Sequence, residues 1–160
     1  SGYQDAEVIY PYYRLQEAGH KVDLIGPEAD TDYQGKYGYT FSSDISAEQA
    51  DGSDYEAVVV PGGWAPDAMR VKPEMVDLIQ QAENSENTTI AAICHGPQLL
   101  VEADVVEGKR ATAYRAVKVD LINAGAEFED SEVVVDQNLI TSRTPDDLPA
   151  FLDALLEQIQ

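Results

Sequence analysis

Residues 90–100 read Ile-Ala-Ala-Ile-Cys-His-Gly-Pro-Gln-Leu-Leu, an apolar run that ends at Cys94 and passes into helix-like sequence within three residues. A buried strand that turns sharply into a helix projects the residue at the turn beyond the carboxyl end of its sheet. Gly96 would let the two arms of such a turn pack closely. The stretch therefore predicts a nucleophile elbow that presents Cys94, with His95 beside it as base or positive partner. The start of the helix is expected to lower the pKa of the thiol.

The segments around this elbow alternate between strand-like and helix-like patterns. The continuous apolar run at 57–60 is typical of a strand that is buried on both faces of a parallel sheet, and residues 88–93 are expected to form another buried strand. The remaining expected strands are 22–25, 111–114 and two hairpins at 35–41 and 132–143; the expected helices are 5–18, 73–82, 97–103, 116–123 and 147–159. Such alternation predicts one α/β domain over residues 1–160, with a mostly parallel sheet and helices on both faces.

The first element of this domain is a helix instead of the strand that normally seeds an α/β sheet. The chain opens on a short loop and enters the helix at Asp5. We therefore expect a further strand ahead of Ser1, since the sheet would otherwise lose a central member and the apolar burial that it supplies.

A second segment with candidate catalytic groups follows the strand at 57–60. It reads Pro-Gly-Gly-Trp-Ala-Pro-Asp from residue 61 to Asp67. Gly62 and Gly63 expose backbone N–H groups beyond a strand end, as an oxyanion hole requires. Asp67 supplies a carboxylate that could orient a histidine. A Pro-Gly-Gly loop on its own indicates only a turn, so this interpretation depends on the elbow at Cys94.

Three segments resemble the ThiJ/PfpI family of the class I glutamine amidotransferase-like superfamily. They are residues 5–12 (Asp-Ala-Glu-Val-Ile-Tyr-Pro-Tyr), residues 62–67 and residues 92–98. The resemblance runs in register through nearly the whole chain and is specific to the PfpI branch, which includes archaeal intracellular proteases with described deglycase and glyoxalase activities. It implies a flavodoxin-like three-layer sandwich and cysteine chemistry without a cofactor.

The resemblance also implies roles for individual residues. Cys94 would be the nucleophile and His95 its partner, and Asp67 would complete the triad from the neighbouring subunit of a homo-oligomer, either a dimer or a hexamer of three dimers. The backbone N–H groups of Gly63 and His95 would form the oxyanion hole. The pocket is expected to contain four further side chains: Gln4, Glu7, Trp64 and Tyr114.

One expected departure from the family pattern concerns the glutamate that usually hydrogen-bonds the reactive thiol. In register, that position falls on Gln4, whose amide can donate to a thiolate but cannot exchange a proton. Glu7 lies one helical turn further along the same face and is a weaker substitute. A solvated helix charge is the equally weighted alternative for Glu7.

The composition is strongly acidic. Asp and Glu number 30 against 10 Lys and Arg, which gives a formal net charge of −20. A surface of this sign does not bind nucleic acid, since phosphate binding needs a basic surface. The acidic residues are spread over the whole chain, which indicates a halophilic, archaeal-type protein whose charges are screened at high salt. The alternative is an acidic protein from an organism that lives at ordinary salt concentrations.

Together these features predict a cytoplasmic, cysteine-dependent hydrolase that acts on peptide or small carbonyl substrates. No stretch is apolar enough to span a membrane, and the two histidines and single cysteine, His20, His95 and Cys94, do not form a metal site. A lone cysteine is by itself more often a buried apolar residue than a nucleophile. The main alternative is a stress-response chaperone or redox sensor that uses oxidation of Cys94. An amidotransferase domain is a weaker hypothesis, because the C-terminal third has no histidine.

Overall fold

The computed structural model describes residues 1–160 and is built around one four-stranded sheet in the order β5-β6-β10-β9. Strands β5 (Ala57–Val60), β6 (Thr89–Ile93) and β10 (Leu139–Ser142) are parallel, and β9 (Val133–Asp136) is antiparallel to β10. All five residues of β6 are buried, as expected for an apolar strand at the centre of a parallel sheet. The predicted mostly parallel sheet is confirmed.

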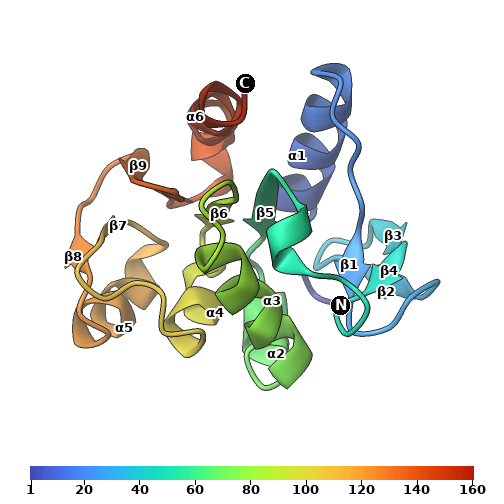
Figure 1. Ribbon diagram of the computed structural model, residues 1–160, viewed down its shortest axis with the longest axis horizontal. Helices are drawn as coiled ribbons and strands as arrows, with labels where there is room; N and C mark the ends of the chain where they lie inside the picture. Colours follow the sequence, from blue (N-terminus) through green and yellow to red (C-terminus); the bar gives the residue numbers. More distant parts are fainter.

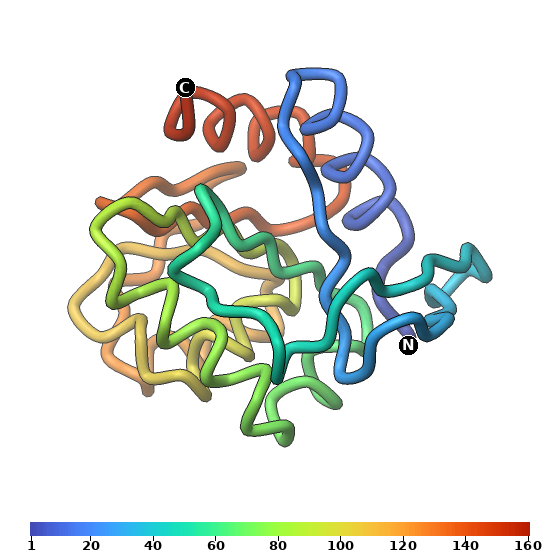
Figure 2. Tube along the Cα trace, turned by 45° about the vertical axis from the view of Figure 1, so that its right-hand side comes forward, coloured from blue at the N-terminus to red at the C-terminus, as the bar shows by residue number.

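Helices cover both faces of this sheet (Figure 1). Helix α1 (Asp5–Glu17) and helix α6 (Leu148–Gln158) lie on one face and contact each other, as Figure 2 also shows. Helix α3 (Pro73–Glu83), helix α4 (Pro97–Glu102) and helix α5 (Lys118–Asn123) lie on the other. The molecule is therefore a three-layer α/β sandwich of the predicted flavodoxin-like class.

The two layers of helices enclose two separate apolar cores. Phe151 of α6 is fully buried against Ile93 of β6 in one core, and Leu100 of α4 is fully buried beside Ile90 in the other. Successive residues of a strand point to opposite faces, so one apolar strand can supply both cores. This explains why β6 is apolar at every position from Ile90 to Ile93.

Several short elements complete the chain. The short paired strands are β1 (Ile25–Gly26) with β4 (Ile45–Ser46), β2 (Asp32–Gln34) with β3 (Thr40–Ser42), and β7 (Arg110–Ala111) with β8 (Glu127–Phe128). The short helices are α2 (Ala65–Met69) and three 3₁₀ turns, η1 (Gly52–Asp54), η2 (Arg115–Val117) and η3 (Pro145–Asp147).

The predicted boundaries are wrong at two strands. The strand predicted at 22–25 is reduced to β1, and the strand predicted at 111–114 is reduced to β7. Both pair along one edge only, with equally short partners, so few ladder hydrogen bonds extend them. The hairpin predicted at 35–41 is present, although its strands flank a loop at 35–39. Helix α2 was not predicted.

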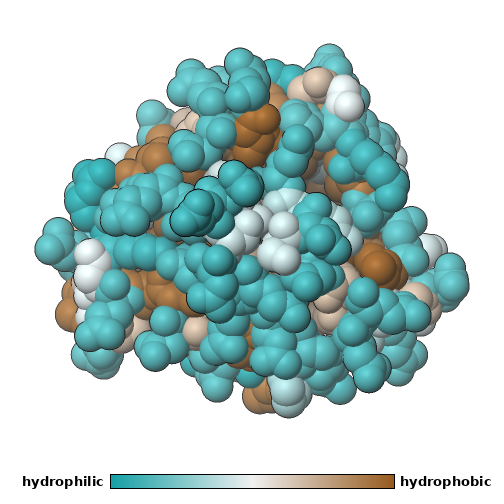
Figure 3. All heavy atoms as spheres, viewed as in Figure 1, coloured by the Kyte–Doolittle hydropathy of each residue, from teal (hydrophilic) through white to brown (hydrophobic).

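The surface carries far more acid than base. Figure 3 shows a face dominated by hydrophilic residues. Seven of the 30 acidic side chains form ion pairs with Lys or Arg and Glu56 contacts His20, which leaves 22 without such a partner. None of the helices is both long enough and apolar enough to cross a bilayer. Like charges that lack partners repel one another, and this repulsion destabilises the compact state at low salt.

We expect the thermal midpoint to rise by at least ~10 °C between 0.1 M and 2 M KCl, because the Debye length falls from about 10 Å to below 3 Å over this range. Differential scanning calorimetry measures the shift. Sucrose that gives the same osmolality is the control, since it is excluded from protein surfaces without screening charge. A midpoint that KCl moves no further than sucrose does would contradict both the repulsion argument and the halophilic hypothesis.

Candidate active site

The turn between β6 and α4 places Cys94 at the carboxyl end of the central strand. Its φ angle is 63°, in the left-handed region that non-glycine residues rarely adopt. Two backbone hydrogen bonds hold this conformation: Cys94 N–H donates to the Ser142 carbonyl at 3.0 Å, and Tyr114 N–H donates to the Cys94 carbonyl at 2.9 Å. A strained residue fixed by its neighbours at a strand-to-helix turn is the geometry of a nucleophile elbow.

Two glycines make room for this turn. A Cβ added to Gly96 would lie 2.5 Å from the Val60 carbonyl oxygen, so only glycine fits between β6 and β5. A Cβ added to Gly62 would lie 2.8 Å from the Cys94 Cβ and 2.8 Å from Glu7 Oε2. The Gly62 backbone must therefore approach the cysteine closely, which explains the glycine at this position.

Glu7 is the carboxyl group beside the thiol. Its side chain is 1% exposed, and Oε2 accepts a hydrogen bond from Gly62 N–H at 2.6 Å. Its other oxygen, Oε1, is buried without a nitrogen or oxygen partner, and the carboxyl group is within hydrogen-bonding reach of the Cys94 thiol. Burial raises the pKa of Glu7 to about 7. The carboxyl group can therefore hold a proton near neutral pH and share it with the sulfur.

The thiol does not have the lowered pKa expected from the following helix. Cys94 is 7% exposed, and burial together with the negative charge of Glu7 raises its pKa to about 12. Helix α4 is only six residues long, so the favourable field at its start is small beside the cost of burying a charge. This corrects the prediction: the pKa of Cys94 is set first by burial of the thiol and then by the charge of Glu7.

Two backbone N–H groups point at the sulfur. Hydrogen bonds from the Gly63 and His95 amides to the Cys94 thiolate both act to lower its pKa. Gly63 has φ 77° and pairs with Tyr3 in an isolated bridge, which orients the loop after β5. The structure thus brings together the two amides that were predicted to form an oxyanion hole.

His95 is positioned against the thiol on its other side. Its Nδ1 lies 3.3 Å from Cys94 Sγ, and its ring stacks on the ring of Tyr114 with centroids 4.8 Å apart. Burial, assisted by the positive charge of Lys36, lowers the pKa of His95. The imidazole is therefore mainly neutral at pH 7 and can accept a proton.

The structure places Gln4 away from the thiol. Its Oε1 accepts hydrogen bonds from Ala6 N–H at 2.6 Å and Glu7 N–H at 3.4 Å, so Gln4 caps the start of α1. Glu7 occupies the place beside Cys94 that was assigned to Gln4. The reason is helical geometry, because Glu7 lies on the face of α1 that packs on the sheet.

Asp67 and Trp64 lie at the rim of the site. Asp67, in the first turn of α2, is exposed and forms no hydrogen bond or ion pair with His95. Trp64 is 63% exposed, and its ring lies 5.0 Å from the Lys36 ammonium group. Within one chain, the carboxylate partner of the cysteine is therefore Glu7, and Asp67 faces outward.

Two residues of the site were missed in the sequence. Asp5 is buried and accepts hydrogen bonds at 2.8 Å from the amides of both Tyr37 and Tyr39, which fixes the loop that carries Lys36. Lys36 thereby supplies a positive charge next to His95 and Trp64. The sequence signal for Asp5 was weak, since a carboxylate at the start of a helix is usually explained by the helix dipole alone.

Neither of the two main cavities is lined by Cys94 or His95, although Glu7 contributes to one of them. No three histidine, cysteine or carboxylate side chains gather closely enough to hold a metal ion. The chemical groups of the site are thus one thiol, one imidazole, one carboxyl and two aimed amides.

These features define a class of protein: an α/β sandwich with a cysteine on a nucleophile elbow beside a buried glutamate. The sequence profile of the DJ-1/PfpI family matches residues 1–158. The chain belongs to the DJ-1/PfpI family.

Individual relatives agree with this assignment. A deglycase of Pyrococcus abyssi is 43% identical over 150 residues, which cover 94% of this chain and 89% of the relative. General stress protein 18 of Bacillus subtilis is 41% identical over 151 residues, which cover 93% of this chain and 87% of the relative. A solved structure from Anabaena variabilis, with DJ-1/ThiJ/PfpI-like and ferritin-like domains, superposes with a TM-score of 0.96 at 42% identity, over 99% of this chain and 46% of that chain.

Proposed function

We propose that this protein is a cysteine-dependent hydrolase of the PfpI type, which acts on the carbonyl carbon of an amide, a glycation adduct or an α-oxoaldehyde. One observation carries the proposal: Cys94 meets Glu7, His95 and the amides of Gly63 and His95 at a single strained turn. The deglycase name of a relative at 43% identity supports the same chemistry. We place the reaction in the cytoplasm, where a free thiol stays reduced.

The first step forms a sulfur–carbon bond. The Cys94 proton passes to Glu7 or His95, and the sulfur electron pair adds to the carbonyl carbon as the carbonyl π bond opens onto oxygen. The resulting oxyanion accepts hydrogen bonds from the Gly63 and His95 amides, which are already directed at the neighbouring sulfur. Donors fixed before the reaction stabilise this charge without further reorganisation.

The second step releases the amine. The carbon–nitrogen bond breaks as the oxyanion returns its electrons to carbon, and His95 delivers a proton to the departing nitrogen. Water then adds to the thioester, its proton passes back to His95, and the sulfur–carbon bond breaks to restore Cys94. An α-oxoaldehyde has no amine to release: in its adduct with Cys94, a base removes the proton from the former aldehyde carbon, and protons are returned to the neighbouring carbon and its oxygen. This internal rearrangement gives a thioester, which the same water step hydrolyses to a 2-hydroxy acid.

A substrate panel tests the proposal. Purified protein in molar KCl is assayed on fluorogenic peptides, on methylglyoxal and on amino acids glycated by methylglyoxal. We expect turnover of at least one of the three kinds of substrate, and the kind that is turned over identifies the activity. The result against the proposal is no turnover of any group by protein whose fold is confirmed by circular dichroism.

The outward-facing Asp67 has a place in this proposal as a residue of a neighbouring subunit. Within one chain it makes no contact with His95, and it lies on the rim beside the exposed Trp64. We propose that a second copy packs against this rim in a dimer or hexamer, so that its Asp67 orients His95.

Asp67→Asn is expected to reduce kcat by roughly 10- to 1000-fold, since an amide cannot orient and stabilise a protonated imidazole. Subunits that carry Asp67→Asn are then mixed with subunits that carry Cys94→Ala. Hybrid oligomers should regain activity, because each hybrid contact joins an intact Cys94 to an intact Asp67. Asp77→Asn, at an exposed carboxylate of α3, is the matched control and should leave kcat unchanged. Mixtures that stay inactive would rule out sharing between subunits.

A second candidate function is redox sensing with chaperone activity. It is favoured by the stress-protein name of one relative and by the single cysteine, which cannot form a disulfide within the chain. Peroxide would oxidise the Cys94 thiolate to a sulfenate with loss of water, and a second peroxide would give the sulfinate. Suppression of aggregation that depends on Cys94 oxidation, without turnover in the panel, would select this candidate.

A further inference from the structure

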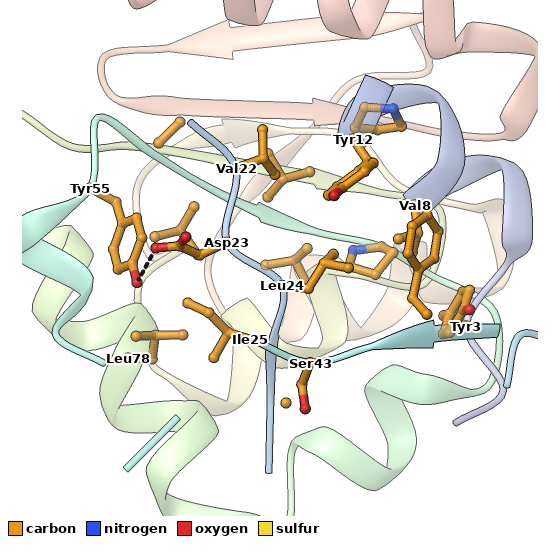
Figure 4. A pocket seen from close by; sticks show the side chains of 18 of the residues that line it. Tyr3, Val8, Tyr12, Val22, Asp23, Leu24, Ile25, Ser43, Tyr55 and Leu78 are labelled. Atoms are coloured by element: carbon orange, nitrogen blue, oxygen red, sulfur yellow. Dashed lines mark hydrogen bonds between the residues drawn. The ribbon is translucent and has the colours of Figure 1, made fainter. Parts of the chain in front are cut away.

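The two strands that flank β6 differ in what lies beside them. Strand β5 borders a cavity of about 760 Å³, which Figure 4 shows among Val8, Leu24 and Leu78. Cys94 does not line this cavity. On the other side of β6, strand β10 pairs with it as far as Ser142, which is in register with the residue directly before Cys94. The end of β10 is therefore the part of the sheet that lies next to the elbow.

This strand end holds the strained turn. The Ser142 carbonyl accepts from Cys94 N–H at 3.0 Å and so helps to keep the φ angle of Cys94 at 63°. Ser142 itself is fully buried, and its hydroxyl donates to the Glu132 carbonyl at 2.6 Å. A strained backbone conformation persists only where its surroundings over-determine it. The position of the Ser142 carbonyl therefore bears directly on the direction of the sulfur.

The next residue, Arg143, ties the strand end to two other segments. Its guanidinium group donates to Asp147 twice, from Nε to Oδ2 at 2.9 Å and from Nη2 to Oδ1 at 3.1 Å. Its Nη1 donates to Asp130 Oδ1 at 2.9 Å, and its backbone N–H donates to Asp147 Oδ2 at 3.3 Å. A two-pronged contact of this kind fixes direction as well as distance. Because the Asp147 side chain is only 8% exposed, salt screens this contact less than it screens a surface ion pair.

The Asp147 carboxylate does not do what its place in the chain would suggest. Asp147 is the N-cap residue of α6, where an aspartate normally accepts a hydrogen bond from an amide of the first helical turn. Here the carboxylate makes no such bond and is directed at Arg143 instead. Stabilisation of the helix start therefore does not explain this aspartate, whereas a role at the end of β10 does.

Helix α6, which begins next to this contact, packs against the elbow. Leu148 and Phe151 of α6 belong to the same apolar core as Ile93 and Cys94. Helix α6 also contacts α1, the helix that carries Glu7. The pairing of arginine and aspartate therefore joins the helix that packs on the cysteine to the strand that holds the cysteine backbone.

We propose that Arg143 is a positioning residue for Cys94 and that Asp147 acts together with it. The fork of Arg143 holds the start of α6 against the end of β10, and this contact keeps the Ser142 carbonyl in place. The carbonyl in turn holds the Cys94 amide and keeps the sulfur directed at the groups that activate it. The inference rests on the proposed function only in taking Cys94 as the reactive thiol, since Arg143 acts through the cysteine and not on a substrate.

Three variants separate positioning from general stability. Asp147→Ser keeps a residue that suits an N-cap but removes the contact with Arg143. Arg143→Lys keeps the positive charge but cannot form the two parallel hydrogen bonds. Arg110→Lys is the matched control, because Arg110 likewise binds a carboxylate (Glu129) and a carbonyl group (Val135), but from β7 instead of the end of β10.

Two measurements in 2 M KCl report on the elbow without any substrate. Hydrogen exchange by NMR follows the Cys94 amide, with the Ile90 amide, which donates to the Asn138 carbonyl at 2.8 Å, as the reference within the same strand region. The rate of alkylation of Cys94 by iodoacetamide is recorded against pH. Thermal midpoints identify the temperature range in which each variant is folded.

We expect Asp147→Ser to speed exchange at Cys94 by at least about 30-fold while Ile90 changes by less than about threefold. The midpoint of the alkylation profile should move up by at least about one pH unit, toward the ordinary thiol value of about 8.5, because the sulfur leaves its activating groups. Arg143→Lys should give intermediate changes in both readouts, and Arg110→Lys should give neither.

An unchanged alkylation profile in both variants of the pair would overturn the proposal. So would equal acceleration of exchange at Cys94 and Ile90, or the same changes in Arg110→Lys, since either result indicates general loosening of the sheet. If Asp147→Ser does not fold, Arg143→Lys decides alone. Because neither readout needs turnover, a failure of the proposed hydrolase activity is distinguished from a failure of this inference.

Discussion

Cys94→Ala is expected to lower kcat/KM by at least about 10³-fold on every substrate that the wild-type protein turns over, because removal of a nucleophile leaves only binding and the aimed amides to act. The sulfur atom is the point on which Glu7, His95 and the Gly63 amide converge. None of these groups can form the carbon–sulfur bond in its place. The residual rate therefore measures what positioning and electrostatics contribute without covalent chemistry.

Cys94→Ser is the matched control for this experiment. Serine keeps the approximate shape and the strained turn, but its hydroxyl is a far weaker acid than the thiol and stays protonated against the buried Glu7. We expect serine to be almost as inactive as alanine, while both variants keep the thermal midpoint within a few degrees. Steady-state kinetics on the active substrates measures the loss of activity, and calorimetry of all three proteins measures the thermal midpoints. Wild-type turnover by either variant would remove Cys94 from the mechanism.

The layers of the fold and the elbow could be predicted from sequence, because each depends on local pattern. The stretch from 90 to 93 is apolar at every position, as is typical of a strand buried on both faces. The glycine at 62 marks the place where a backbone approaches the cysteine, and the glycine at 96 marks the place where the turn approaches the Val60 carbonyl. Short strands such as β1 and β7 were predicted too long, since their length depends on which edges find partners.

The ionisation of the site could not be predicted in the same way. The effect of a helix start on a thiol can be inferred from sequence, but burial depends on the packing of all layers around the sulfur. The packing of these layers also determines whether Gln4 or Glu7 lies beside the thiol. Both lie near the start of α1, and only the three-dimensional path shows that Gln4 caps the helix while Glu7 points to the thiol. A register argument alone therefore assigned the wrong residue.

Glu7→Gln is expected to slow alkylation of Cys94 by iodoacetamide at least about 10-fold at pH 7.5. In the wild-type pair, both groups are protonated at low pH and the thiol is inert. As the pH rises through about 7, the pKa of Glu7, one proton leaves the pair and the sulfur carries part of the remaining charge. Alkylation should therefore rise between pH 5 and 7 and then level off. Glutamine cannot accept the thiol proton, so this rise should move to well above pH 8.

The free energy of unfolding should fall over the pH range in which the alkylation rate rises. The folded pKa of Glu7, about 7, lies above the ordinary value of 4.5, so the folded state binds this proton more tightly than the unfolded chain does. The stabilisation is complete below pH 4.5 and is lost as the pH rises through 7. Relative to Glu7→Gln, the wild-type protein should therefore lose roughly 3 kcal/mol between these limits. Urea titrations at several pH values measure this difference.

Glu17→Gln, at an exposed carboxylate near the end of the same helix, separates the effect of position from that of charge. It should change neither the alkylation profile nor the pH dependence of stability, because its side chain is exposed to water and lies ten residues further along the chain than Glu7. The two readouts of Glu7→Gln have different physical origins, the reactivity of sulfur and the linkage of protons to folding. If glutamine leaves the alkylation profile unchanged, the proton of Cys94 goes to His95 alone, and the buried carboxyl group only supports the Gly62 loop.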